Sequence, residues 1–304
     1  MQLFKRLLTA LVILGIAAGI AYAISPRFRL LTLVLIGGSP VCPLRLAVDT
    51  QGHLERLKTI HDRILSASRL VAEKDGLELW DTPKGRYWIP KGNRYVLPFN
   101  LAEMESHIYG SGEHFVKPGD IVLDCGASDG DFSHEALNAG AKLVVAIEIS
   151  PASVECLRRN LAPEIAQGRA IVYPKGVWNK DDTLPLNVAD KNFAANSVVL
   201  NAPGAHATYI AQLTTIDKIV GELALPRVDF IKMDIEGAEV NALRGARETL
   251  RQFRPRLAIA TEHKPDDEVA IPNAVHAVQS DYRAECGYCA QANGHIHPEV
   301  MYFY

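Results

Sequence analysis

The sequence of 304 residues has few cysteines and little net charge, and it contains no internal repeat or low-complexity segment. Its five cysteines are an odd number and are scattered along the chain, which does not indicate a framework of disulfide bonds. A net charge of −3 gives no electrostatic reason to expect nucleic acid as a partner. Because 48% of the residues are hydrophobic and 22% are charged, we expect an ordinary globular core.

The first 36 residues differ in composition from the rest. Residues 7–24 carry no charge, and their number is close to the lower limit of about 17 for crossing a bilayer. We expect an uncleaved single-pass membrane anchor followed by an apolar juxtamembrane segment, together 1–36. A signal peptide cleaved near 21–23 and a buried core helix remain open as alternatives. Basic residues on both sides balance each other and predict no orientation.

Residues 37–115 form a second region that precedes the main domain. From Gln51 to Glu73 apolar residues recur every three or four positions, which is typical of one face of a helix. Gly76 is expected to end this helix. Two short aromatic and β-branched segments, 77–80 and 86–90, are separated by turn-rich sequence and predict a hairpin. We expect the helix and hairpin to cover the main domain.

Strands and helices alternate through the third region, 116–304. We predict strands at 121–124, 142–148, 170–178, 229–234 and 256–262, and helices near 131–139, 151–161, 214–223 and 238–251. This alternation predicts an α/β fold with a parallel sheet and helices on both of its faces. The tail differs, because two strand-like segments flank an Asn293-Gly294 turn and therefore predict an antiparallel hairpin.

A glycine loop follows the first predicted strand, at the sheet edge where ligands of open parallel sheets bind. Asp124, Gly126 and Gly130 form a D-x-G-x-x-x-G pattern that leads into a helix. Glycines allow a tight turn and a close approach of the backbone to a ligand. Glu148 ends the second strand, and an acid about 20 residues after such a loop can accept hydrogen bonds from ribose hydroxyls. The pattern therefore predicts an adenosine-containing ligand.

The residues of the loop distinguish between such ligands. In place of G-x-G-x-x-G, the first glycine is followed by Ala-Ser-Asp, and Asp124 and Asp129 bring negative charge. These acids would repel a pyrophosphate but attract ammonium and sulfonium groups. S-adenosylmethionine carries both cations, so it is the predicted cofactor. A tight turn without any ligand is the alternative.

Three segments resemble the FkbM family of S-adenosylmethionine-dependent methyltransferases, namely VLDCGASDGDFSHEAL, AIEISPASVECLRRNL and VDFIKMDIEGAEVNALRGARETL. The resemblance covers about 77–304. It implies the class I methyltransferase fold, which is Rossmann-like with a mostly parallel seven-stranded sheet and a C-terminal antiparallel hairpin, and O-methylation of a hydroxyl. By position it implies cofactor binding by Asp124, Gly126, Ser128, Gly130 and Glu148. Cys125 and 128–129 depart from the usual family residues, and no adenine-binding residue can be identified near 177–179.

A second group of acids follows the strand at 229–234. Asp234 is expected at the same sheet edge, beside the methyl group to be transferred. Glu236 and Glu239 follow one turn later and are candidate substrate-binding residues, although both could instead stabilise a helix N-terminus. Lys232 shares a strand face with Asp234, so a buried Lys232 is expected to pair with an acid.

Candidate catalytic residues are those that could take a proton from the acceptor. Methyl transfer gains most from alignment and exclusion of water, and a general base is needed where the acceptor is a hydroxyl. Asp234, Glu262 and His263 are the candidates, and a structural role for His263 is the alternative.

We predict no metal site. A divalent ion held by Asp234 and Glu262 is an alternative. The group of Cys286, Cys289, His295 and His297 is not expected to bind zinc, because residues three apart in a strand point to opposite faces. Cys125 is expected to be a small packed residue.

Together these patterns predict a membrane-anchored methyltransferase that acts on a hydroxyl of a saccharide, glycolipid or related metabolite. Segment 187–206 is a candidate acceptor loop. S-adenosylmethionine is made in the cytosol, so we expect the catalytic domain on the cytosolic side. The alternatives are a nicotinamide- or nucleotide-sugar-dependent Rossmann enzyme, and a catalytically silent, membrane-tethered interaction protein.

Overall fold

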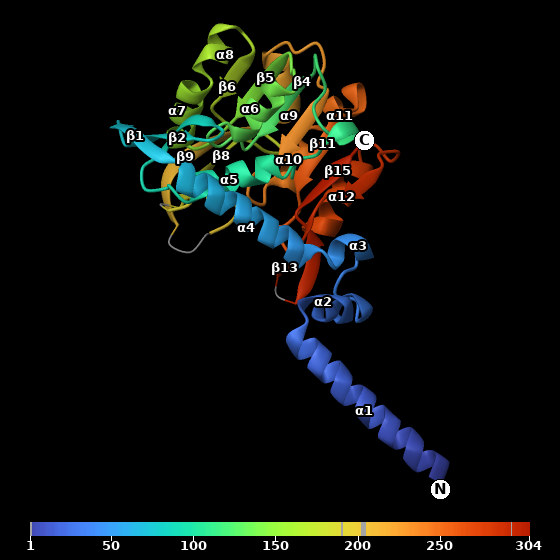
Figure 1. Cartoon of the computed structure of the whole chain (residues 1–304). Helices are drawn as coiled ribbons and strands as arrows, with labels where there is room; N and C mark the ends of the chain where they lie inside the picture. The colour runs from blue at the N-terminus through green and yellow to red at the C-terminus, as the bar shows by residue number, and fades with distance from the viewer. Residues whose placement is uncertain (1, 190, 202–204, 293) are drawn as a thin grey trace.

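A seven-stranded sheet forms the centre of the computed structural model, which describes residues 2–189, 191–201, 205–292 and 294–304 (Figure 1). Its strands lie in the order β6 (Ala170–Tyr173), β5 (Leu143–Ile147), β4 (Ile121–Cys125), β10 (Phe230–Met233), β11 (Arg256–Ala260), β15 (Val300–Phe303) and β12 (Ala284–Cys286). The first five are parallel, and β15 runs antiparallel to both of its neighbours. This arrangement confirms the predicted α/β fold, because one reversed strand inserted next to the edge strand of the sheet is the arrangement of class I methyltransferases.

Helices flank this sheet and bury its apolar side chains. They are α6 (Asp131–Asn138), α7 (Pro151–Asn160), α8 (Ala162–Ala166), α9 (Ile216–Glu222), α10 (Glu239–Arg244), α11 (Arg247–Phe253) and α12 (Asp267–His276). The prediction of one helix over 238–251 was wrong, because the chain breaks between α10 and α11 at Gly245. A Cβ atom at Gly245 would lie 2.0 Å from the backbone oxygen of Trp178, so the close approach of these two segments requires glycine.

A small second sheet interrupts the alternation between β6 and α9. It contains β7 (Gly176–Val177), β9 (His206–Thr214) and β8 (Asp182–Val188) in that order, and a short 3₁₀ turn, η2 (Phe193–Ala195), lies between β8 and β9. The single strand predicted at 170–178 is therefore two strands in two different sheets. Gly176 pairs with Leu213 of β9 instead of continuing the central sheet.

The region before the main domain is a helical and β layer that packs against it. It consists of α3 (Leu44–Ala47), α4 (Thr50–Ala67), a sheet of β1 (Arg69–Lys74), β2 (Leu77–Thr82) and β3 (Gly85–Pro90), α5 (Val96–Glu105) and the turn η1 (Gly112–His114). The predicted hairpin is thus confirmed as β2–β3, but the predicted helix ends at Ala67 and Val71 lies in β1. Asn160 of α7 exchanges hydrogen bonds of 2.7 and 2.9 Å with the backbone of Trp88, which joins this layer to the central sheet.

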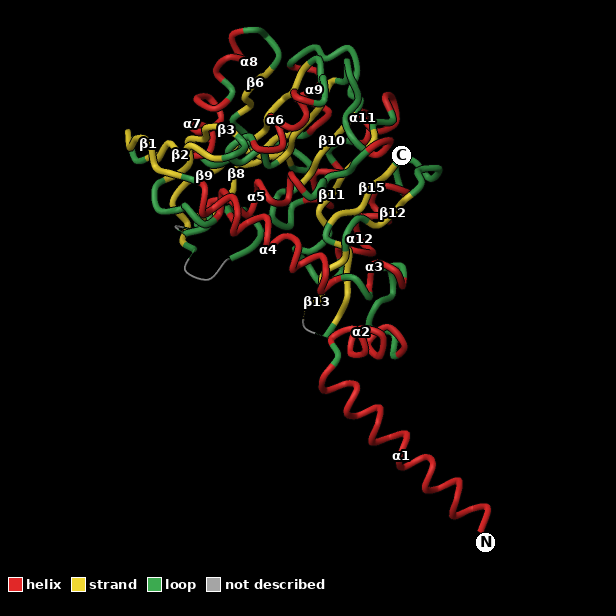
Figure 2. Tube along the Cα trace, viewed as in Figure 1, coloured by secondary structure: helices red, strands yellow, loops and turns green. Residues whose placement is uncertain are grey.

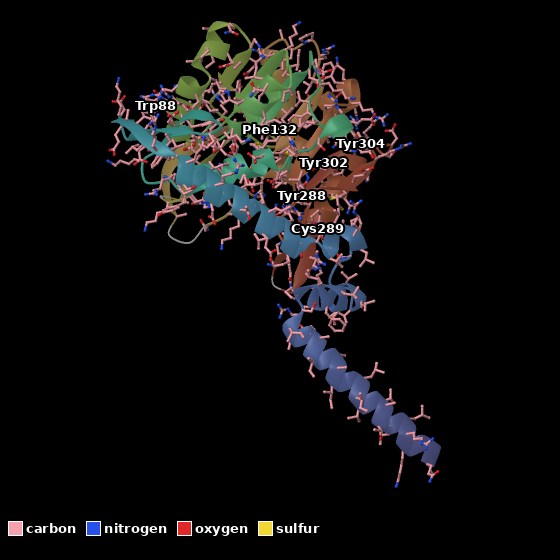
Figure 3. The ribbon with its side chains drawn as sticks, in the orientation of Figure 1. Trp88, Phe132, Tyr288, Cys289, Tyr302 and Tyr304 are labelled. Atoms are coloured by element: carbon pink, nitrogen blue, oxygen red, sulfur yellow. A yellow bond between two sulfur atoms is a disulfide. The ribbon has the colours of Figure 1, made fainter. Side chains whose placement is uncertain are left out.

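The N-terminal helix α1 (Gln2–Ile24) extends away from the rest of the molecule, and its side chains project into open space (Figures 1 and 3). Its segment Phe4–Ile24 has a mean hydropathy of 2.4, and none of its most apolar window is buried. This exposure does not fit the alternative of a buried core helix. By length and composition α1 fits a membrane span, and a signal sequence has the same properties.

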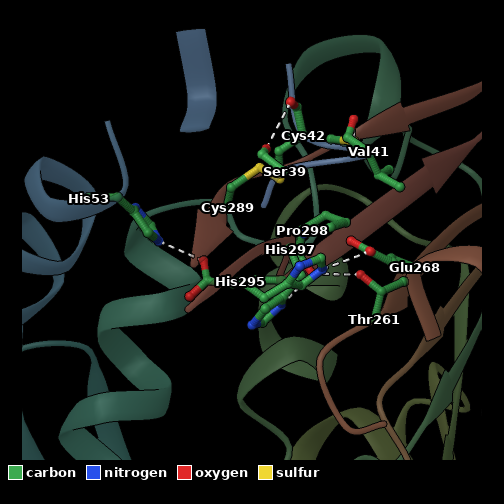
Figure 4. The surroundings of a disulfide bond; sticks show 12 residues. Ser39, Val41, Cys42, His53, Thr261, Glu268, Cys289, His295, His297 and Pro298 are labelled. Atoms are coloured by element: carbon green, nitrogen blue, oxygen red, sulfur yellow. Dashed lines mark hydrogen bonds and ion pairs between the residues drawn. A yellow bond between two sulfur atoms is a disulfide. The ribbon is translucent and has the colours of Figure 1, made fainter. Parts of the chain in front are cut away.

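A disulfide joins the segment that follows α1 to the C-terminal part of the chain, as Figures 3 and 4 show. Cys42 and Cys289 form this bond with their Cα atoms 6.5 Å apart, a single disulfide that the number and spacing of the cysteines did not indicate. The pairing has no local signal because 247 positions separate the two residues. Both cysteines are buried with Leu30 of α2 (Pro26–Leu35) and Ile296.

The C-terminal strands only partly match the predicted hairpin. The strands β13 (Cys289–Ala292) and β14 (His295–Pro298) form a small antiparallel hairpin, whereas the outer strands β12 and β15 pair with each other in the central sheet. Asn293 of the predicted turn lies outside the described residues. The tube in Figure 2 shows β13 beside α2 and α3 at the end of the molecule from which α1 leaves.

Candidate active site

Two adjoining cavities lie at the carboxyl ends of β4, β5 and β10, the edge at which open α/β sheets bind ligands. The first, called the cofactor cavity here, is lined by Gly126, Ser128, 147–149, 175–177, Leu213, 234–236 and Ala238, and by Phe193, Ala194, Asn196 and Val198. The second, called the acceptor cavity, has a volume of about 350 Å³. Gly126, Ser128, Ala194, Asp234 and Glu236 line both cavities, so the two meet at these residues.

The glycine loop wraps closely around the ends of two strands. The backbone amides of Gly126 and Ala127 both donate hydrogen bonds of 3.0 Å to the carbonyl oxygen of Ile147. Gly126 has φ +79°, and a Cβ atom there would lie 1.8 Å from the backbone oxygen of Asp234. Only glycine therefore fits at this position. Ser128 also has a positive φ, +52°, and lines both cavities.

Glu148 lines the cofactor cavity at the end of β5, as the sequence predicted. Its carboxylate accepts hydrogen bonds of 2.8 Å from the backbone amides of Ser128, Ile149 and Ser150. A carboxylate has about four lone-pair positions, so one position remains for a ribose hydroxyl. Burial raises the pKa of Glu148 in spite of these three hydrogen bonds.

Asp124 does not line either cavity but lies fully buried beneath the loop. One of its oxygens accepts a hydrogen bond of 2.7 Å from Ser133, and the other lies 3.4 Å from Nζ of Lys232. Lys232 also donates a 2.7 Å hydrogen bond to the carbonyl oxygen of Gly126. The expected pairing of Lys232 with an acid is thus confirmed. Through these bonds, Asp124 and Lys232 support the loop from below.

Asp129 and Gly130 likewise lie behind the cavity wall. Asp129 is fully buried, and burial and the nearby Asp131 raise its pKa well above the usual value, which favours the neutral form of its carboxyl group. It therefore does not supply the negative charge toward the cofactor that the sequence indicated. Gly130 has φ +92° and packs against Leu157 at the start of α6, where it shapes the loop without touching the cavity.

The far wall of the cofactor cavity comes from two segments for which the sequence predicted no contact with the cofactor. Lys175, Gly176 and Val177 follow β6, where the adenine end of the ligand is expected in this fold. The candidate acceptor loop, 187–206, contributes Phe193 and neighbouring residues to this cavity, and Asn192 and Ala194 to the acceptor cavity. Phe193 donates its backbone amide to Asn93 Oδ1 at 3.1 Å, which holds the segment against the N-terminal layer.

The acceptor cavity opens between the sheet edge and helices α4 and α5. The helices and the turn before α5 contribute His61, Tyr95, Val96, Phe99, Asn100, Glu103 and Met104. The sequence predicted a helix over 51–73 as part of a covering layer but not as a wall of the site, and it did not predict α5. The spacing of apolar residues does not tell which face of a helix meets a cavity. The turn after α5 contributes Tyr109, the start of α6 contributes Asp131, and the sheet edge contributes Lys232, Asp234, Glu236, Glu262 and His263.

Asp234 lies at the predicted edge of the sheet, where the two cavities meet. Its Oδ2 accepts a 2.5 Å hydrogen bond from the hydroxyl of Tyr109, and its Oδ1 lies 3.4 Å from Nε2 of His263. Although desolvation acts to raise it, the pKa of Asp234 is lowered because Lys232, His263 and the Tyr109 hydroxyl stabilise the carboxylate. Tyr109 was missed because it lies outside any motif, 125 positions before its partner.

His263 is fixed by Glu239 behind it. Its Nδ1 lies 3.0 Å from Oε1 of Glu239, and its Nε2 points to Asp234 and Glu236 at 3.4 and 3.8 Å. Burial alone would lower the pKa of His263, but its hydrogen bond to Glu239 and the two nearby carboxylates raise it to about 10. Glu239 is itself fully buried at the start of α10 and accepts the backbone amides of Ile235 and Gly237. It therefore positions His263 and does not contact the cavities.

Glu236 occupies a strained turn between Asp234 and α10. Its φ is +53°, a region that glycine favours, and its backbone oxygen accepts a 2.7 Å hydrogen bond from Ser197. Its side chain is 23% exposed and faces the junction of the cavities, and desolvation raises its pKa to about 7. Glu262 is more exposed than Glu236. It lines the acceptor cavity and is not among the carboxylates that contact His263.

The cysteines and histidines of the C-terminal hairpin do not converge on one site. Cys289 is bonded to Cys42, and Cys286 lies 3.6 Å from the carbonyl oxygen of Val41. His295 pairs with Glu268 at 2.8 Å (Figure 4). Within the described residues, these four side chains do not form a metal cluster. Cys125 is buried, as expected.

The strand order, the glycine loop after β4 and the acid after β5 define a class I methyltransferase. Residues 124–289, more than half of the chain, match the methyltransferase FkbM domain. The chain belongs to the FkbM methyltransferase family, and the cofactor of this family is S-adenosylmethionine. The residues of the cofactor cavity fit S-adenosylmethionine. Glu148 retains one free hydrogen-bond acceptor position, and it lies beside the glycine loop that lines the same cavity.

Solved structures show further similarity. The structure of methyltransferase FkbM from Methylobacillus flagellatus KT is 19% identical, with a TM-score of 0.47, over 84% of this chain and 60% of that chain. SMU.1697c of Streptococcus mutans, solved with S-adenosylhomocysteine, is 13% identical, with a TM-score of 0.38, over 62% of this chain and 90% of that chain. An rRNA methylase from Streptococcus thermophilus is 12% identical, with a TM-score of 0.37, over 62% and 87% of the two chains. No curated protein sequence matches the chain.

Proposed function

We propose that the protein is an S-adenosylmethionine-dependent O-methyltransferase whose acceptor is a hydroxyl of a saccharide, glycolipid or related metabolite. The observation that carries this proposal is the junction of the cofactor and acceptor cavities at Gly126, Ser128, Asp234 and Glu236. A methyl group can pass directly between two ligands only where their cavities meet.

In this proposal the chain aligns the two ligands and excludes water. When bound, the cofactor supplies an electrophilic methyl group on a sulfonium. Glu148 accepts a ribose hydroxyl, and the backbone at Gly126 and Ser128 forms the floor of the cavity. Phe193 and the residues after it close the opposite side. Alignment of this kind is worth roughly 7–11 kcal/mol of an activation barrier.

Asp234 is proposed to accept the hydrogen bond of the acceptor hydroxyl and to take its proton. With the cofactor bound, the methyl group would leave the sulfonium sulfur for the acceptor oxygen, and S-adenosylhomocysteine would be the leaving group. Tyr109 and His263 hold the carboxylate of Asp234 in place. Glu236 is proposed to contact the acceptor from the other side of the junction, and Glu262 to contact its distal part at the cavity mouth. Proton transfer of this type contributes typically about 10²–10⁴-fold to a rate.

The experiment uses the full chain in detergent with methyl-labelled S-adenosylmethionine and fractionated saccharide and glycolipid extracts. We expect labelled methyl ethers, which resist mild alkali, whereas methyl esters release methanol. Asp234→Asn should lower their formation about 10²–10⁴-fold while S-adenosylhomocysteine binding is retained. Binding of a nicotinamide nucleotide or a nucleotide sugar, with none of S-adenosylhomocysteine, would support the alternative Rossmann enzyme. Cofactor binding with no labelled product would support the silent interaction protein.

The acceptor is proposed not to be nucleic acid. Five carboxyl side chains line the acceptor cavity, those of Glu103, Asp131, Asp234, Glu236 and Glu262. Phosphate groups would be repelled by those that are ionised. Ribosomal and transfer RNA in the same labelling assay test this proposal, and label incorporated into RNA would contradict it.

Membrane attachment through α1, with the catalytic domain on the cytosolic side, is proposed from the apolar helix and the origin of the cofactor. The Cys42–Cys289 bond favours the opposite side, because disulfides persist mainly in oxidising compartments. A reporter fused after Tyr304 measures the side directly. Activity of a reporter that works only outside the cytosol would overturn the cytosolic placement, and loss of α1 from the mature chain would show a signal peptide.

A further inference from the structure

We propose that Asp234, Glu236 and His263 form a binding site for one divalent cation at the junction of the cofactor and acceptor cavities. Each of the three residues offers one ligand atom, and these atoms all lie within 4.8 Å of one another. Atoms bound to one Mg²⁺, Mn²⁺ or Ca²⁺ ion, at about 2.0–2.6 Å from it, are separated from each other by roughly 3–5 Å. The 3.4 and 3.8 Å distances from His263 Nε2 to the two carboxylates fall in that range.

The orientation of His263 is that of a metal ligand. Histidines that bind metals usually direct their other ring nitrogen to a carboxylate, which fixes the ring and the tautomer. Glu239 performs this function for Nδ1, and it is held in turn by the amides of Ile235 and Gly237. Because Nδ1–H donates to Glu239, the lone pair of a neutral His263 lies on Nε2 and faces Asp234 and Glu236.

This arrangement requires a cation. A lone pair on Nε2 and two carboxylates that face each other repel unless a proton or a metal ion lies between them. The second oxygen of Glu239, Oε2, is buried and has no hydrogen-bond partner among the described residues, which adds to the negative potential behind His263. The supporting residues are therefore arranged to hold positive charge at Nε2.

The charges around the site point the same way. Five carboxyl groups line the acceptor cavity against one lysine, Lys232, and two histidines, His61 and His263. Lys232 opposes a further cation, but its ammonium group is already bonded to Gly126 and Asp124 beneath the loop. Carboxylates suit Mg²⁺, Ca²⁺ and Mn²⁺, and imidazole suits transition metals, so this mixed set of ligands favours a transition-metal ion such as Mn²⁺ over Mg²⁺.

The proposed role of the ion toward the acceptor rests on the proposed methyl transfer. The binding of the ion to Asp234, Glu236 and His263 does not depend on it. An ion at the cavity junction would bind the acceptor oxygen, favour its deprotonated form and orient it toward the cofactor. Acceptors with two neighbouring oxygens, such as vicinal diols of a sugar, would bind through both. The proposed acceptors are therefore polyols that can bind the ion through two neighbouring oxygens.

The test is a titration of the full chain in detergent with Mn²⁺, followed by the electron paramagnetic resonance signal of the free ion. We expect one tightly bound equivalent. Glu236→Gln and His263→Ala each remove a ligand and should abolish tight binding, and Glu239→Gln should weaken it about 10–100-fold. The matched control is Glu262→Gln, which removes a carboxylate from the same cavity outside the triad and should leave Mn²⁺ affinity unchanged.

Binding of S-adenosylhomocysteine serves as the independent control for each variant. Glu148→Ala should lose S-adenosylhomocysteine but retain Mn²⁺, so failure of the cofactor proposal and failure of the metal proposal give different results. Tight Mn²⁺ binding that survives Glu236→Gln and His263→Ala would overturn the site. So would the absence of Mn²⁺ binding in wild-type protein that binds S-adenosylhomocysteine, because the cation on Nε2 would then be a proton.

Discussion

The α-carbon of Gly126 faces the backbone oxygen of Asp234 so closely that a Cβ atom would lie 1.8 Å from it. The glycine loop that lines the cofactor cavity and the acid that is proposed to act on the acceptor are therefore in direct contact. This contact fixes the distance between the two ends of the reaction site, since neither β4 nor β10 can shift without the other.

Replacing Gly126 by alanine should abolish S-adenosylhomocysteine binding and destabilise the protein. The new methyl group collides with the Asp234 backbone, and the φ of +79° is strained for alanine. Gly168→Ala is the matched control, because Gly168 has φ +69° but no atom within 4 Å of a Cβ, so only a conformational cost of about 1 kcal/mol is expected. Calorimetric titration and thermal unfolding measure the two effects. Equal behaviour of both variants would contradict the collision.

Removing the buried ammonium of Lys232 should be strongly destabilising. Lys232→Met leaves the fully buried Asp124 without its cation, and loss of one partner of a buried pair costs about 3–5 kcal/mol. The double variant Asp124→Asn/Lys232→Met should be less destabilised than Lys232→Met alone, because no charge is then left unpaired. The exposed Lys218–Asp181 pair is the control, and Lys218→Met should cost about 0–1 kcal/mol. Urea unfolding gives these values, and an equal loss at both lysines would refute the prediction.

The affinity for S-adenosylhomocysteine should fall at mildly acidic pH. Burial raises the pKa of Glu148, so its carboxylate is protonated at a higher pH than an exposed glutamate. The protonated carboxyl loses an acceptor position for the ribose hydroxyl, and affinity decreases as the pH falls through this raised pKa. Glu148→Gln should bind weakly and without this pH dependence. Titrations between neutral and acidic pH test the prediction, which fails if both proteins follow one curve.

Loss of the Tyr109 hydroxyl should slow methyl transfer without weakening cofactor binding. This hydroxyl donates to Oδ2 of Asp234, and a hydrogen bond to a charged group is worth about 1.5–3 kcal/mol, or about 10–150-fold in rate. Tyr282→Phe is the control, because its hydroxyl donates to Pro255 away from the cavities. The labelling assay described above measures both. Unchanged activity of Tyr109→Phe would show that Asp234 is positioned by other contacts.

The Cys42–Cys289 bond should stabilise the folded protein by closing a long loop. Its sequence separation is 247 residues, and disulfides typically contribute about 2–4 kcal/mol. Cys42→Ser should therefore lower the unfolding midpoint, whereas Cys286→Ser, at a free thiol, should have little effect. Alkylation of free thiols before and after reduction, followed by peptide mapping, shows the bond directly. Protein that carries five free thiols in its native compartment would place the domain in a reducing environment.

The sequence determined the main sheet and the position of the site. Strand–helix alternation predicted β4, β5, β10 and β11. The residues that follow each apolar run predicted Gly126, Glu148 and Asp234 at one sheet edge. These features depend on local periodicity and on the rule that parallel strands end at the same edge. Both the periodicity and the residues at the end of each strand can be read from short stretches of one sequence.

Only the tertiary structure decided which of the acids face a ligand. Asp124 and Asp129 are buried in the interior, where Asp124 pairs with Lys232 and burial raises the pKa of Asp129. Glu236 lies in a turn with a positive φ and lines both cavities. Tyr109 and Cys42 find partners more than a hundred positions away, and such pairings have no periodic signal. The free energy of burying each polar group depends on neighbours that only the packed chain supplies, and for this reason the site's charges could not be assigned from the sequence alone.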